Sequence, residues 1–271
     1  MATSALHACT DGKGRQVADS KSDMDSALYK LIMAHLAKLD TYVPGSYKRG
    51  GEGKRELIAK YAADPLFSIW GLDSSEYIAA ALAGGTITSI HRKLGDIYQD
   101  AVKSIFITTL RQTAAHIAYK AVIVSGTKEE NRSTDAYLQF NRLRMPAKGR
   151  IIKWCQTELG KLATHPKVKL VGVGMEIRHC YQTGDSKRTQ ADEAMARHLI
   201  VAGILPVMPL FCNQSNPIVI ARYRSLWTIL QGMDSYDMIR TFTGYDFYDF
   251  LMRNRNEFRK PVIAMLRRLS V

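Results

Sequence analysis

Apolar residues recur at three- and four-residue steps in several stretches of the chain, which is the spacing of one helix face. In residues 26–39 the stripe contains Leu28, Ile32 and Leu36, and a second stripe follows in residues 86–106. Asp185 is suited to cap a further helix and Gly203 to end it. We therefore predict helices over 26–39, 86–106, 149–162 and 185–202, and a largely helical chain after residue 217 with a turn at Gly244.

Short β-branched and apolar runs predict four strands, over residues 118–125, 131–140, 168–180 and 204–212. The third is the clearest, because it begins as a continuous apolar run and ends in charged residues. Pro206 and Pro209 restrict the fourth to a position where missing N–H donors do not matter. From residue 89 onward, the order of elements predicts an α/β fold with helices flanking a central mixed sheet.

The first third of the chain carries a different pattern. Residues 1–23 are small and polar, which predicts a loose arm. Residues 44–55 are glycine-rich and basic, which predicts an exposed loop that could contact DNA. We divide the chain into an N-terminal arm and helical region (1–85) and a core with C-terminal helices (86–271), together forming one compact domain. Aromatic residues near the C-terminus, such as Phe247, Phe250 and Phe258, are interpreted as core, with an interface as the alternative.

The net charge of the chain suggests the kind of partner that it binds. The 271 residues include 38 Lys+Arg and 25 Asp+Glu, a formal net charge of +13. Such a field attracts polyanions, of which nucleic-acid backbones are the commonest. The alternative is that the charge only keeps the protein soluble. The start of the sequence lacks the apolar run of a signal peptide, and no window reaches the roughly 18 apolar residues of a membrane span. We expect a cytoplasmic protein of a bacterial or archaeal cell, with no membrane partner.

The remaining composition argues against several cofactors. Cys9, Cys155, Cys180 and Cys212 are widely spaced and form no CxxC pair, which argues against zinc and gives no reason to expect disulfides. A reducing compartment fits this usage. The sequence contains neither GxGxxG nor GxxxxGKS, so we expect no nucleotide cofactor.

Two acidic residues are placed for metal chemistry. Asp135 enters one predicted strand, and Glu176 follows the apolar run of the clearest strand. A carboxylate at the rim of a core sheet is costly unless it is paired or binds a metal. Carboxylates that converge at strand ends can hold Mg²⁺, which activates water for phosphodiester hydrolysis. The alternatives are a turn acid for Asp135 and a simple rim charge for Glu176.

Asp135 together with Glu176-Ile177-Arg178 on a later strand resembles the PD-(D/E)xK nuclease core of type II restriction endonucleases. The resemblance covers residues 89–212. It implies a restriction-endonuclease-like fold, a Mg²⁺ cofactor held by Asp135 and Glu176, and hydrolysis of double-stranded DNA at specific sequences. It also implies a homodimer, because twofold pairing matches palindromic sites.

The sequence departs from the family pattern at two positions. Thr134 stands where the family has proline, and Arg178 stands where it usually has lysine. Arginine stays protonated, so Arg178 can stabilise charge but cannot act as a general base. Lys187, in the triplet that starts at Asp185, is the alternative catalytic cation. Asp96 is a candidate additional acid near the metal, with an exposed acid at a helix start as the favoured alternative.

Two histidines are weaker candidates. His198 is interpreted as a core residue, and His179 as a less favoured nuclease histidine, because no second histidine is close in sequence.

Basic residues near the predicted site suggest DNA contacts. A cluster within twelve residues follows the Asp135 strand, and a pair follows the last predicted strand; the predicted contacts are Arg142, Arg144, Lys148, Arg150, Lys153, Arg222 and Arg224. Beside a metal site, the first cluster would clamp backbone phosphates. Two other functions remain open, namely a non-catalytic DNA-binding protein and an RNA-acting nuclease.

Overall fold

The fold comes from a computed structural model that describes residues 12–40, 58–59, 61–63, 74–125, 128–162, 169–181 and 186–269. The predicted loop at 44–55, the capping residue Asp185 and Cys9 lie outside the described residues. No helix within these ranges is both long enough and apolar enough to cross a bilayer.

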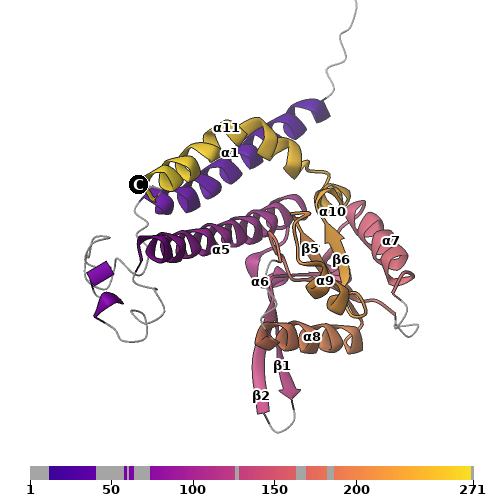
Figure 1. Cartoon of the computed structure of the whole chain (residues 1–271). Helices are drawn as coiled ribbons and strands as arrows, with labels where there is room; N and C mark the ends of the chain where they lie inside the picture. The colour runs from indigo at the N-terminus through magenta and orange to yellow at the C-terminus, as the bar shows by residue number, and fades with distance from the viewer. Residues whose placement is uncertain are drawn as a thin grey trace, which may run out of the picture.

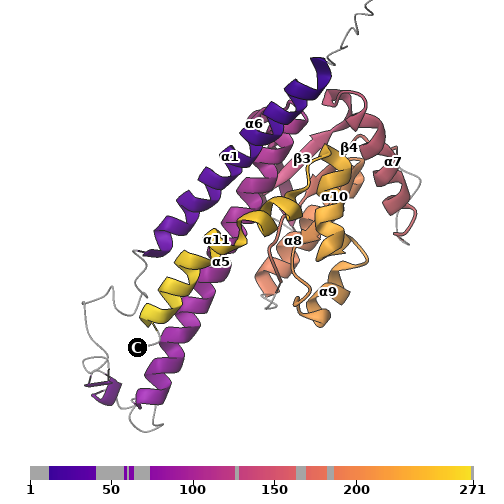
Figure 2. The same ribbon diagram turned by 90° about the horizontal axis from the view of Figure 1, so that it is seen from above.

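Three long helices lie side by side in both views (Figures 1 and 2). They are α1 (Gly12–Asp40), α5 (Ser75–Thr109) and α11 (Phe247–Leu269). The predicted stripe at 26–39 is confirmed, since Leu28, Ile32 and Leu36 are buried. The loose arm is wrong for residues 12–23, because α1 already begins at Gly12.

Helix α5 begins earlier than the sequence pattern predicts. It contains the predicted helix 86–106, and Ser74 caps its first turn by accepting a hydrogen bond from the Tyr77 N–H at 3.3 Å. The division between residues 85 and 86 therefore falls inside one continuous helix, so it does not mark a linker.

The central sheet has four strands in the order β3-β4-β5-β6. They are β3 (Ala136–Gln139), β4 (Gly172–Met175), β5 (Ile204–Leu210) and β6 (Thr228–Gln231). β3 runs antiparallel to β4, and the other pairs are parallel. The predicted α/β class with a mixed sheet flanked by helices is therefore confirmed.

The two faces of the sheet are covered by different helices. Val173 and Val207 belong to one buried cluster with side chains of α5, of α7 (Ala147–Leu159) and of α10 (Met233–Thr243). Met208 belongs to a second cluster with α8 (Ser186–Val201) and α9 (Pro217–Tyr223). Gly174 lets α8 approach, because a Cβ there would meet Leu199 at 3.1 Å. α7 and α8 thus lie on opposite faces of the sheet.

Several strand predictions need correction. The predicted strand 131–140 is two strands, because the chain leaves β2 (Lys128–Thr134) at Asp135 and starts β3. β2 pairs with β1 (Tyr119–Ser125) in a separate hairpin, which projects from the core in Figure 1. The strand predicted over 168–180 is limited to β4, with one further bridge between Arg178 and Leu210.

β5 and β6 also differ from the predictions. β5 is a central strand although it contains Pro206 and Pro209. Pro206 precedes the first residue that pairs with β6, so its missing N–H costs no bond on that side. β6 was predicted to be helical, because four residues are too few to show the alternation of apolar and polar positions that is typical of a strand.

The remaining elements complete the core. The short helices α6 (Ala114–Ile117) and η1 (Phe140–Arg142) flank β3, and Gly244, with φ +77°, ends α10 where the turn was predicted. Phe247 and Phe250 are fully buried, which supports the core interpretation of the C-terminal aromatics.

Candidate functional site

The strand register places Asp135 and Glu176 beside each other. Ala136 pairs with Met175 across the β3–β4 ladder, and the Asp135 N–H donates to the Met175 carbonyl at 3.0 Å. Asp135 immediately precedes β3, and Glu176 immediately follows β4. Because the two strands are antiparallel, these positions meet at the same rim of the sheet. The predicted convergence of the two acids has a direct geometric basis.

Arg178 joins the two carboxylates. Its Nη1 donates to Asp135 Oδ2 at 2.9 Å, and its Nη2 donates to Glu176 Oε2 at 2.7 Å. The same Nη2 lies 3.9 Å from Asp192 Oδ1 on α8. We call Asp135, Glu176, Arg178 and Asp192 the carboxylate–arginine cluster. It contains three acids and one guanidinium, and it is largely buried.

Asp135 is held by more than Arg178. Its Oδ2 also accepts from the Ile177 N–H at 2.8 Å, and its Oδ1 accepts from the Gln99 side chain on α5. Burial raises the pKa of Asp135, although Arg178 and the Ile177 N–H act in the opposite direction. A carboxylate has about four acceptor sites, so one of them remains after these three bonds.

Glu176 is the most perturbed acid of the cluster. Glu176 is 6% exposed, and burial raises the pKa of its carboxyl group to about 8. Arg178 lowers this pKa, whereas Asp135 and Asp192 raise it further. Burial alone would lower the pKa of Arg178, but Glu176 and Asp135 outweigh burial and raise it. The cluster therefore has a local excess of negative charge, which Glu176 relieves by keeping a proton at neutral pH.

Asp192 was missed as a site residue by sequence reasoning. It is 7% exposed, and its Oδ2 accepts hydrogen bonds from the hydroxyls of Tyr181 at 3.0 Å and Tyr223 at 3.1 Å. Its backbone carbonyl accepts from the Trp227 indole N–H at 3.2 Å. A charged residue on the inner face of a predicted helix was the available signal. Its aromatic partners are distant in sequence and gave none.

A pocket of 490 Å³ opens beside the cluster, between α5 and the start of α8. We call it the α5–α8 pocket. The side chains that matter most along its wall are His91, Arg92, Gln99, Arg178, His179 and Arg188. Asp96, the candidate additional acid, also lines this pocket and lies 3.4 Å from the Lys93 ammonium. Arg178 and Gln99 thus connect the pocket to Asp135.

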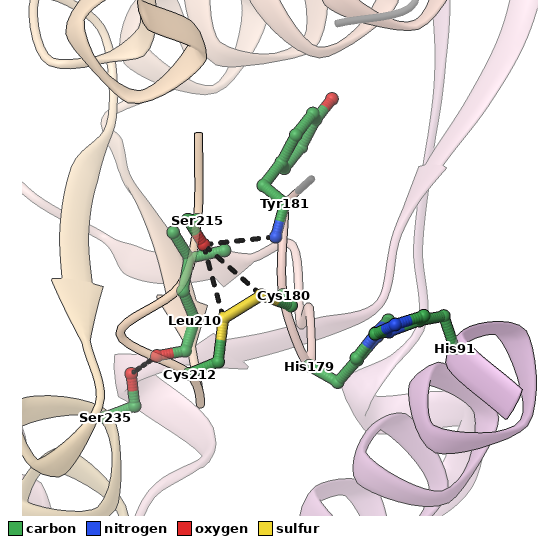
Figure 3. The surroundings of a disulfide bond; sticks show 8 residues. All are labelled: His91, His179, Cys180, Tyr181, Leu210, Cys212, Ser215 and Ser235. Atoms are coloured by element: carbon green, nitrogen blue, oxygen red, sulfur yellow. Dashed lines mark hydrogen bonds between the residues drawn. A yellow bond between two sulfur atoms is a disulfide. The ribbon is translucent and has the colours of Figure 1, made fainter. Parts of the chain in front are cut away.

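His179 has a histidine partner that its sequence neighbourhood did not reveal. His91 Nδ1 and His179 Nε2 are 2.9 Å apart, and Figure 3 shows the two rings facing each other between α5 and the segment after β4. Burial lowers the pKa of His179 to about 4, and His91, Arg178 and Arg188 lower it as well. His198 is instead a partly buried structural residue bonded to the Tyr119 hydroxyl at 2.9 Å.

A disulfide closes the same segment. Cys180 and Cys212 are bonded, with their Cα atoms 5.3 Å apart, and the Ser215 hydroxyl lies against both sulfurs (Figure 3). Cys180 also lines the α5–α8 pocket. The expectation of no disulfide is wrong for this pair, because β4 and β5 are adjacent and their ends bring the two cysteines together. Cys155 is a buried free thiol.

The predicted DNA-contacting residues after β3 do not lie at this rim. Arg142, Arg144, Lys148, Arg150 and Lys153 form what we call the post-β3 basic run. The run follows the far end of β3, and its helical part, α7, covers the face opposite α8. Arg144 lines a small pocket together with Thr109 of α5. Thr109 is ten residues, or about 15 Å of helix, from Gln99, the residue of α5 that contacts Asp135.

The other predicted residues lie on α7, α9 and α8. The Arg150 guanidinium donates to the Thr241 carbonyl at 2.9 Å and the Phe242 carbonyl at 3.4 Å, so it caps the end of α10. Arg222 and Arg224 are exposed at the end of α9. Lys187 is in the first turn of α8, and its side chain is outside the described part of the chain.

The described residues contain no group of three or more His, Cys, Asp or Glu side chains that could hold a metal ion. The pair Asp135 and Glu176 nevertheless suits Mg²⁺, which commonly binds through one or two carboxylates, with waters and substrate phosphates completing its shell. In the cluster three acids share one guanidinium, and a divalent cation would supply further positive charge.

Comparison of the chain with family models, with curated proteins and with solved structures found no match.

Proposed function

We propose that this chain is a Mg²⁺-dependent endonuclease that hydrolyses phosphodiester bonds of double-stranded DNA in a sequence-specific manner. The observation that carries the proposal is the pairing of Asp135 and Glu176 across the β3–β4 register, with Arg178 on both carboxylates. The PD-(D/E)xK resemblance supplies the reaction class, the restriction-endonuclease-like core and the homodimer.

Asp135 and Glu176 would hold the cation through the acceptor positions that their present hydrogen bonds leave free. When bound, Mg²⁺ supplies activation of water and neutralisation of phosphate charge. Glu176 would give up its proton on metal binding, because a nearby cation lowers the pKa of a carboxyl group. Gln99 and the Ile177 N–H would keep Asp135 oriented throughout.

Arg178 would act through charge. Its guanidinium pairs with both Asp135 and Glu176 in the structure, and it also lines the pocket. A modest movement toward the pocket would place it against the negative charge that develops on the scissile phosphate. Arg178 remains protonated, so a water molecule with another acceptor must take the role of the base.

A second candidate function is a non-catalytic DNA-binding protein. One observation favours it, because Arg178 already pairs with both carboxylates and so provides a purely structural reason for their burial. In that case the charge of +13 would serve binding alone.

Incubation of the purified protein with a large DNA tests the proposal. Discrete fragments should form at millimolar Mg²⁺ and should be absent in chelator. DNA binding without fragments across a titration of Mg²⁺ and Mn²⁺ would reject hydrolysis and support the binding protein. Cleavage of RNA but not of DNA would correct the substrate.

A further inference from the structure

The α5–α8 pocket gathers cationic side chains from separate elements. Arg92 comes from α5, Arg188 from the start of α8, and Arg178 from the segment after β4. Arg92 and Arg188 are exposed, and within the described ranges neither forms an ion pair with a carboxylate. The Arg188 guanidinium lies 5.9 Å from the centre of the Tyr181 ring, which orients it along the wall.

The acids near the pocket are already engaged. Asp96 lies against Lys93 at 3.4 Å, and Asp135 and Glu176 both accept from Arg178. The pocket therefore combines two exposed guanidinium groups with carboxylates that have their own partners. Guanidinium groups bind phosphate oxygens with two parallel N–H bonds, so the arrangement suits a phosphate.

We propose that the α5–α8 pocket binds the backbone phosphate next to the scissile bond, with Arg92 and Arg188 as its two ligands. This inference rests on the proposed function, since it places the substrate strand against the carboxylate–arginine cluster. The main phosphate contact would then be made by this pocket and not by the post-β3 basic run. A volume of 490 Å³ holds a phosphate with its sugar, and Arg178 at the wall connects this site to the reacting group.

The His91–His179 pair lines the same pocket and can report on a bound phosphate. His179 is surrounded by His91, Arg178 and Arg188, and all three disfavour its protonation, in addition to burial. Arg178 and Arg188 thus act on His179 at this wall. An incoming phosphate would offset their charge and raise the pKa of His179. Because Asp96 and Lys93 compensate each other, they do not reverse this sign.

A binding measurement in chelator separates this inference from catalysis. Labelled duplex DNA is titrated with wild type, with Arg92→Ala/Arg188→Ala and with the matched control Arg255→Ala/Arg259→Ala, whose exposed arginines lie on α11. Each titration is repeated at several salt concentrations. Thermal melting confirms that every variant is folded, and a third variant, Arg92→Lys/Arg188→Lys, keeps the charge but removes the bidentate fork.

The pocket variant should bind DNA at least about tenfold more weakly, and its salt slope should fall by about 0.9 for each lost contact. The control should match wild type, and the lysine variant should keep the slope but lose part of the affinity. Thymidine 3′,5′-bisphosphate should raise the His179 pKa, measured by NMR, in wild type and not in the pocket variant.

An unchanged affinity and slope in the pocket variant would overturn the inference, even if the protein cleaves DNA. Equal losses in the pocket variant and the α11 control would also overturn it, since the charge would then act only through the net field. Loss of binding as expected, in a protein that never cleaves, would keep the pocket assignment and reject the hydrolytic proposal.

Discussion

The α5–α8 pocket and the post-β3 basic run are both rich in arginine, but they are built differently. The run has five basic residues within twelve positions, and it lies at the far end of β3 from Asp135. The pocket takes its arginines from three separated segments and lies against the carboxylate–arginine cluster. Charge that is concentrated in sequence is therefore not the charge that is closest to the candidate chemistry.

The largest expected difference between the two regions is in the rate of cleavage. Arg178→Ala should reduce the single-turnover rate on the order of 10²-fold or more, the usual cost of deleting one preorganised donor. Arg178→Lys should keep partial activity. Arg144→Ala in the post-β3 basic run should leave the single-turnover rate of cleavage of bound DNA unchanged. If Lys187→Ala is the inactive variant and Arg178→Ala cuts normally, the catalytic cation is Lys187.

The disulfide should affect the pocket side of the molecule. Cys180 and Cys212 close a loop with a sequence separation of 32, and such a bond typically contributes about 2–4 kcal/mol to the free energy of unfolding. Reduction, or Cys180→Ser, should lower stability by that amount in denaturant melts. It should also increase hydrogen exchange in residues 176–181 and leave α7 unchanged. Equal stability of the reduced and oxidised proteins would show that the bond does not constrain this segment.

Glu176 should make stability depend on pH in the metal-free protein. Its folded pKa, about 8, lies above its ordinary value of 4.5, so the stabilising contribution is complete below about pH 4.5 and disappears as pH rises through 8. Glu176→Gln should flatten the stability profile in that window, measured by denaturant melts in chelator. A profile in the variant identical to that of wild type would mean that Glu176 is ionised in the fold.

The smallest effect on DNA binding is expected at Arg150, a member of the post-β3 basic run that caps the end of α10. Its bonds to the Thr241 and Phe242 carbonyls predict that Arg150→Ala lowers the free energy of unfolding by about 0.5–1.5 kcal/mol. DNA affinity should change only slightly when it is measured well below the melting temperature. A strong loss of DNA affinity without a loss of stability would return Arg150 to the DNA interface.

Much of the fold could be predicted from hydrophobic period. The stripe Leu28, Ile32 and Leu36 and the core of α5 were readable because long helices repeat their pattern several times. β6 and the break at Asp135 were not readable, since strands of four residues contain only two inward positions. The helical start at Gly12 was missed because its first turns are polar.

The candidate site was only partly predictable. Asp135 and Glu176 could be identified because each adjoins an apolar run, and the antiparallel register then brings them together. Gln99 and the His91–His179 pair could not, since the partners are 36 and 88 residues apart. For Asp192 the signal was its charge on the inner face of a predicted helix. The post-β3 basic run was predicted to lie beside Asp135 because the two are close in sequence. β3 instead leads the chain away from Asp135, so the run lies at the far end of the strand.

The central claim is that Asp135 and Glu176 form a metal-dependent hydrolytic centre, and plasmid cleavage against Mg²⁺ concentration tests it most directly. Wild type is compared with Asp135→Asn, Glu176→Gln and the control Glu257→Gln, whose carboxylate is on α11 and pairs with Lys260. The account predicts metal-dependent cleavage by wild type and control, and none by either site variant, although both still bind DNA. Undiminished cleavage by Asp135→Asn or Glu176→Gln would contradict it.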